Sequence, residues 1–187
     1  MRFIFPRVAI YVLTCLLTIH ATGLNADQDL AALRDGSLRK LVIHDAPKAN
    51  TYGPLEAMDG SRTHLQDLDS TVLVVNFFAV WCAPCRIEMP SLDQLQSQFN
   101  AEDLTVLVIA TGRHAEGAIE TFLTETRITN LTILRDPTGA FSRSLGVFGL
   151  PTTLLLDANR DEVARLVGDA DWDSASAVAI MTRMLEG

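Results

Sequence analysis

The sequence predicts an α/β domain whose mixed, mostly parallel sheet is flanked by helices. Two runs at 72–78 and 104–110 are rich in apolar and β-branched residues, and the first is apolar on both faces apart from Asn76. Strands of this kind lie in the middle of a sheet that helices cover on both sides. Segments with helical spacing follow both runs, and such alternation of strand and helix is typical of a parallel sheet.

The remaining elements follow in order along the chain. A helix should run from about Cys82 to Phe99, because apolar residues recur there at spacings of three and four, and Pro90 should kink it. The pattern then predicts a helix at about 115–126, a strand at 131–134, a helix at 138–145, strands at 152–157 and 162–167, and a helix at 172–185. The last two strands, joined by a turn, should form an antiparallel hairpin at the end of the sheet.

Composition and charge narrow the functional classes. Hydrophobic residues make up 48% of the chain and charged residues 20%, which is typical of a globular protein. The formal net charge is -8, and no stripe of Lys and Arg is visible. Because nucleic acids are bound through clustered basic residues, we expect no nucleic-acid partner.

The first 26 residues are typical of a signal peptide or an N-terminal membrane anchor. Arg2 and Arg7 precede a mostly apolar run at 8–19, and Ala26 offers the better cleavage point, with Ala21 second. The run is shorter than the roughly 20 residues of a membrane-spanning helix, which favours cleavage. In either case the rest of the chain should face an oxidising compartment.

The chain beyond residue 26 divides into an extension and a main domain. We expect an N-terminal extension at 27–50, which begins amphipathic and becomes polar and Pro-containing, and a main domain at 51–187. A hairpin is expected between Tyr52 and His64, with Asp59-Gly60 at its turn.

Cysteine usage points to redox chemistry. Cys15 lies within the leader, and the apolar run continues past it, which argues against a lipoprotein. After removal of the leader we therefore expect two cysteines, Cys82 and Cys85. Two cysteines exclude a multi-disulfide scaffold and disfavour structural zinc, which usually needs four ligands. We also expect His44, His64 and His114 to lie on the surface or in the hairpin rather than to bind metal.

Cys82 and Cys85 stand at the junction between a predicted buried strand and a helix. Thiols three residues apart in a first helical turn can form a disulfide, and a thiolate at a helix N-terminus is stabilised by the helix dipole. Cys82 is therefore the expected nucleophile, Cys85 the thiol that resolves the mixed disulfide, and Pro84 fixes the backbone at the helix start. A purely structural disulfide is the alternative, but so short a loop gives little stabilisation.

These residues also carry a family resemblance. The string Trp81-Cys82-Ala83-Pro84-Cys85 after a buried strand, followed by Pro90, resembles the thioredoxin superfamily. The wider segment 76–90 looks like the TlpA/ResA branch of exported thiol–disulfide oxidoreductases, and 40–47, 149–153 and 167–172 are similar to further TlpA segments. The resemblance covers about 38–185 and implies a thioredoxin fold with a helix and a strand inserted between its halves.

The resemblance assigns roles to four more positions. Pro151 matches a cis-proline that faces the cysteine pair, and the adjacent backbone at Leu150 would pair with a client peptide. Trp81, together with Pro84, would offer a docking surface beside the pair, although Trp81 as a core aromatic is the alternative. Glu88 matches an acidic position that could exchange a proton with Cys85; the alternative is a solvated acid near the helix start.

The expected function is that of a reductant in the periplasm, either soluble after cleavage or tethered to the inner membrane. Resemblance to this branch implies clients with cysteine pairs in cytochrome oxidase copper-site or cytochrome c biogenesis, a membrane thiol reductase as electron donor, and no cofactor besides the redox-active disulfide. A periplasmic oxidant or isomerase, and a Cu(I)-binding chaperone with Cys82 and Cys85 as ligands, are the alternatives.

Overall fold

The computed structural model describes residues 30–187, so the predicted leader at 1–26 lies outside the described residues. The helices and strands are η1 Gly36–Lys40, β1 Val42–Lys48, β2 Leu55–Ala57, β3 Arg62–Thr63, η2 Leu65–Asp67, β4 Val72–Phe78, α2 Ala83–Ser97, β5 Leu104–Thr111, α3 Ala118–Glu125, β6 Thr132–Asp136, α4 Ala140–Ser144, β7 Thr152–Leu156, β8 Glu162–Val167 and α5 Ala175–Glu186. None of the helices in this part of the chain is long and apolar enough to cross a membrane.

One mixed sheet organises the molecule, with strand order β1-β8-β7-β4-β5-β6-β2-β3. Only β4 with β5 and β5 with β6 pair in parallel, whereas the other five ladders among the described strands are antiparallel. The expectation of a mostly parallel sheet is therefore wrong. A parallel neighbour needs a crossover that returns the chain to the same end of the sheet, and only the connections through α2 and α3 provide one.

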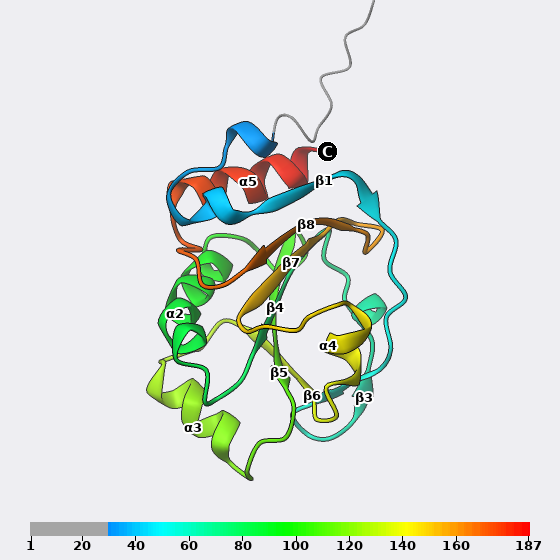
Figure 1. Cartoon of the computed structure of the whole chain (residues 1–187), viewed down its shortest axis with the longest axis vertical. Helices are drawn as coiled ribbons and strands as arrows, with labels where there is room; N and C mark the ends of the chain where they lie inside the picture. The colour runs from blue at the N-terminus through cyan, green and yellow to red at the C-terminus, as the bar shows by residue number, and fades with distance from the viewer. Residues whose placement is uncertain (1–29) are drawn as a thin grey trace, which may run out of the picture.

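The two faces of the sheet are covered differently. Helices α2, α3 and α5 pack on one face, where Phe78 contacts the aromatic ring of Phe122 from α3. Helix α4 and residues 51–68 cover the other face, where Phe77 and Tyr52 contact Phe141. Figure 1 shows α2 and α3 on one side of β4 and β5, with α4 on the opposite side. The buried, two-sided character predicted for the strand at 72–78 is confirmed, since all seven of its residues are buried.

The segments before β4 complete the sheet at both edges. The hairpin predicted between Tyr52 and His64 forms as β2 and β3, and the Asp59 carboxylate accepts the Ser61 N–H across its turn, at 2.8 Å. Residues 42–48, which belong to the predicted extension, form β1 and pair with β8, with a register shift between Ile43 and Lys48. The predicted extension therefore contributes the edge strand β1, although its sequence showed no apolar alternation.

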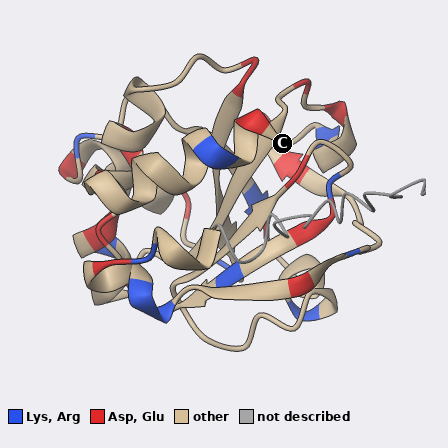
Figure 2. Ribbon diagram, turned by 90° about the horizontal axis from the view of Figure 1, so that it is seen from above, with Lys and Arg blue, Asp and Glu red and all other residues tan. Residues whose placement is uncertain are grey.

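Charged residues are dispersed over helices, strands and loops (Figure 2). Four acidic side chains of the described part are nevertheless buried, namely Glu88, Asp93, Asp136 and Glu162. A buried carboxylate is costly unless donors surround it. Asp93 accepts the backbone N–H groups of Thr129 and Asn130, at 3.0 and 2.7 Å, and thereby fastens α2 to the chain before β6.

Candidate active site

Cys82 and Cys85 lie where β4 delivers the chain into α2. They form a disulfide with a Cα–Cα distance of 5.3 Å. Cys82 is the N-cap of α2, and its sulfur accepts the Cys85 N–H at 3.3 Å. Pro84 occupies the first turn, where a missing N–H costs nothing. Sequence and geometry thus place the Cys82 sulfur on the positive end of a 15-residue helix.

The two cysteines differ in exposure. Cys82 is 4% exposed and Cys85 is fully buried beneath the first turn of α2. An incoming sulfur can therefore reach Cys82 but not Cys85 without rearrangement, which fits the predicted order of nucleophile and resolving thiol. Trp81, directly before the pair, is 74% exposed, so it is not a core aromatic.

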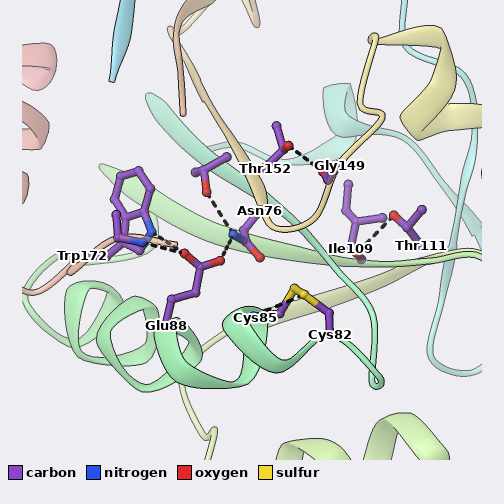
Figure 3. The surroundings of a disulfide bond; sticks show 11 residues. Asn76, Cys82, Cys85, Glu88, Ile109, Thr111, Gly149, Thr152 and Trp172 are labelled. Carbon is purple, nitrogen blue, oxygen red and sulfur yellow. Dashed lines mark hydrogen bonds between the residues drawn. A yellow bond between two sulfur atoms is a disulfide. The ribbon is translucent and has the colours of Figure 1, made fainter. Parts of the chain in front are cut away.

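Glu88 lies one turn after Cys85 and points into the protein between α2, β4 and the chain before α5 (Figure 3). One carboxylate oxygen accepts the Asn76 side-chain N–H at 2.7 Å, and the other accepts the Ala170 N–H at 3.1 Å and the Trp172 indole N–H at 3.2 Å. The side chain is not the solvated helix acid considered as an alternative.

Burial dominates the acidity of this carboxyl group. It raises the pKa of Glu88 to about 7, even though the hydrogen bonds from Asn76, Trp172 and Ala170 lower it. The group is thus poised to change protonation near neutral pH, in the range where thiol chemistry operates.

Asn76 connects this carboxyl group to the strand that follows Pro151. Its amide nitrogen donates to both Glu88 and the Thr153 hydroxyl, at 2.7 and 2.9 Å, and Asn76 pairs with Thr153 in the sheet. The amide oxygen of Asn76 has no hydrogen-bond partner among the described residues.

Asn76 and Trp172 both lie in segments that resemble the TlpA/ResA branch, but neither was predicted to be a site residue. The signal for Asn76 was present, because a polar side chain in a strand buried on both faces must find a partner. Trp172 gave no such signal, since its partner lies 84 positions away and only the fold brings them together.

The loop before β7 brings the predicted client-binding residues to the disulfide. The Leu150–Pro151 peptide bond is cis, as the resemblance implied. Thr152 pairs with Phe77 near the end of β4, which puts Leu150 and Pro151 beside the start of α2. Leu150 packs against the core cluster that contains both cysteines, while Phe148 is 87% exposed.

Arg86 and His44 make their hydrogen bonds to glutamates elsewhere in the protein. Arg86 pairs with Glu125 at 2.8 Å and lies over the Phe122 ring, so its charge is not directed at the cysteine sulfurs. His44 was expected at the surface, which is wrong: its side chain is 7% exposed and bonded to Glu162 at 2.7 Å. Strand β1 pairs with β8 and so carries His44 inward. His64 is exposed before η2, and His114 is half-buried.

Comparisons with known proteins agree with this geometry. The model of the family described as Redoxin matches residues 42–181. The thioredoxin-like protein YneN of Bacillus subtilis is 30% identical over 65% of this chain and 70% of its own length. The thiol-disulfide oxidoreductase ResA of Oceanobacillus iheyensis is 25% identical over 90% and 82%.

A solved structure supports the fold. The thiol:disulfide interchange protein of the thioredoxin family from Chlorobium tepidum superimposes with a TM-score of 0.62, at 24% identity, over 76% of this chain and 99% of its own. The expected thioredoxin fold is thereby confirmed.

Proposed function

Because this chain belongs to the Redoxin family and is a thiol–disulfide oxidoreductase, we propose that it reduces disulfides of client proteins outside the cytoplasm. The observation that carries the reducing direction is the buried carboxyl group of Glu88, which lies one turn after Cys85 on the helix that begins at Cys82. In its ionised form this carboxyl group disfavours the cysteine thiolates, because like charges repel. Destabilised thiolates favour the disulfide form of the enzyme, and therefore favour electron donation to the client.

The reaction proceeds in two exchanges. The Cys82 thiolate attacks one sulfur of the client disulfide, forms a mixed disulfide and releases the other client sulfur as a thiolate. Cys85 then loses its proton, for which Glu88 is the proposed acceptor, and attacks the Cys82 sulfur. The client leaves as a dithiol with two more electrons, and the enzyme is left with the Cys82–Cys85 disulfide.

The proposed clients carry cysteine pairs that must be reduced before copper or haem is attached, in cytochrome oxidase copper-site or cytochrome c biogenesis. Their extended cysteine segment would bind beside Trp81, Pro84, Leu150 and Pro151. A membrane thiol reductase is the proposed donor that restores the dithiol, and the periplasm is the proposed compartment. The resemblance to the TlpA/ResA branch supports these assignments.

The test is the redox equilibrium of the purified protein in a series of glutathione buffers. We expect a potential nearer to the roughly −270 mV of thioredoxin than to the roughly −120 mV of the oxidant DsbA. Glu88→Gln should raise the potential, whereas Glu120→Gln, which removes an exposed acid from α3, should leave it unchanged. A wild-type potential near that of DsbA would make the protein an oxidant or isomerase.

A further inference from the structure

The loop between α4 and β7, residues 145–150, begins with a helix C-cap. Gly146 has φ 68°, the left-handed conformation that glycine adopts without strain. The Gly146 N–H donates to the Arg143 carbonyl and the Val147 N–H to the Ser142 carbonyl, both at 3.0 Å. This pattern turns the chain sharply but leaves the carbonyls of Leu145 and Gly146 without partners from the helix.

Arg165 of β8 supplies the missing donors. One terminal nitrogen of its guanidinium group donates to the Leu145 carbonyl at 2.8 Å, and the other approaches the Gly146 carbonyl at 3.4 Å. A cation at the carbonyl end of a helix is also favoured by the helix dipole. The loop is thus held through its backbone by a side chain that lies 20 residues later in the sequence.

Glu162 fixes the orientation of this guanidinium group. Arg165 makes a two-pronged contact with its carboxylate, at 2.9 and 2.8 Å, and His44 of β1 bonds to the same carboxylate at 2.7 Å. Burial alone would raise the pKa of Glu162, but the hydrogen bonds from Arg165 and His44 hold it below its usual range. A continuous polar chain therefore runs from the edge strand β1 through β8 to the loop.

This loop reaches the redox centre. The loop ends at Leu150, which packs against the core cluster that contains both cysteines. Figure 3 draws Gly149 among the surroundings of the disulfide, and the Gly149 carbonyl accepts the Thr152 hydroxyl at 2.8 Å. The exposed ring of Phe148 stands on the same loop, beside the proposed client-binding residues Leu150 and Pro151. The position of the loop backbone therefore sets where a client segment can bind.

We propose that Arg165 is a positioning residue for client binding: through the carbonyls of Leu145 and Gly146 it holds the 145–150 loop in the geometry that receives the client. The proposal rests on the proposed function, since it assigns a partner-binding role to this loop. Arg165 contacts neither cysteine, so client binding and thiol–disulfide exchange can be measured separately. Its loss weakens client binding and leaves the exchange chemistry of the cysteine pair intact.

The experiment compares Arg165→Met with the wild-type protein on two substrates. One is a synthetic peptide with an internal Cys-Xaa-Xaa-Cys disulfide, and the other is dithiobis(nitrobenzoate), which is too small to need the loop. For the peptide, KM should rise about tenfold, because a charge-assisted hydrogen bond is lost, while kcat changes less than about twofold. The rate with the small disulfide and the reduction potential should stay as in the wild type. Amide exchange at Val147 should become faster.

Arg135→Met is the matched control. Arg135 is likewise a partly buried arginine of the sheet, but it lies on β6, which three strands separate from β8, and it pairs with Glu56 at 3.2 Å. Its removal should leave the peptide KM at the wild-type value. Should Arg165→Met fail to fold, Arg165→Lys takes its place. A lysine cannot make the two-pronged contact with the Glu162 carboxylate while it also donates to the Leu145 carbonyl. The peptide KM of Arg165→Lys should therefore rise as well.

Three results would overturn the proposal. The first is a peptide KM that stays at the wild-type value in Arg165→Met, or in Arg165→Lys where that variant takes its place. The second is an equal loss of rate on the peptide and on the small disulfide, and the third is an unchanged rate of amide exchange at Val147. If the wild-type protein reduces no peptide disulfide, the proposed function fails instead, and the exchange measurement still decides whether Arg165 holds the loop.

Discussion

Replacement of Glu88 by glutamine should abolish one component of the pH dependence of stability. The ordinary pKa of a glutamic acid is 4.5 and that of Glu88 in the folded protein is about 7. Between these values the folded protein keeps a proton that the unfolded chain has lost, so the free energy of unfolding falls as the pH rises. The contribution is complete below pH 4.5 and is lost as the pH passes through 7.

The magnitude follows from the same two values. One pH unit is worth about 1.4 kcal/mol for each proton, so the wild-type protein should lose about 3 kcal/mol between pH 4 and pH 8 relative to the variant. Glutamine fits the site, because the unpartnered amide oxygen of Asn76 can rotate to accept from its side-chain N–H. The other oxygen position still faces the donors of Ala170 and Trp172.

The assay is equilibrium unfolding in urea at a series of pH values, followed by the fluorescence of the fully buried Trp172. The disulfide is kept intact, so that no thiol titrates. Other titrating groups cancel in the difference between wild type and variant, and the exposed Glu120→Gln should follow the wild-type curve. Parallel curves for wild type and Glu88→Gln would refute the reasoning, because they would mean that the three donors outweigh burial and keep the carboxylate ionised.

Three further outcomes are expected. Cys85→Ser should accumulate a mixed disulfide between Cys82 and a client, detectable by mass spectrometry, whereas Cys82→Ser should not; equal trapping by both would contradict the assigned order. Phe148→Ser should change the free energy of unfolding by less than about 0.5 kcal/mol, because the ring is exposed, yet weaken binding of a disulfide peptide in titration calorimetry; unchanged binding would remove the loop from the client site. Asp93→Ala should cost about 2–4 kcal/mol in urea unfolding, because two backbone N–H groups lose their acceptor; a loss below about 0.5 kcal/mol would show that water replaces it.

The central strands and helices could be predicted because their patterns are local. The two-sided apolar run at 72–78 and the hairpin at 55–63 were recognisable from neighbouring residues alone. Strand direction was not, since it depends on how β7 enters beside β4. Strand β1 was missed because it is mostly exposed and carries Pro47, which conceals the usual alternation.

The same distinction holds for the site. Cys82, Cys85 and Glu88 lie within two turns of one helix, so their spacing predicted their proximity. The partners of Glu88 come from β4 and from the chain before α5, and no spacing within the sequence relates them. The sequence left open whether Glu88 is a partly buried carboxyl group with a raised pKa or a solvated acid, and only the fold decided between the two.

The two edge strands of the sheet also affect how readily this protein aggregates. An open sheet edge offers free N–H and C=O groups to which another chain can add a strand, the first step of many aggregates. Here one edge, β1, is interrupted by a register shift and carries Pro47 and Lys48, both exposed. The opposite edge, β3, is two residues long. Neither edge offers a regular template, so the sheet resists templated growth.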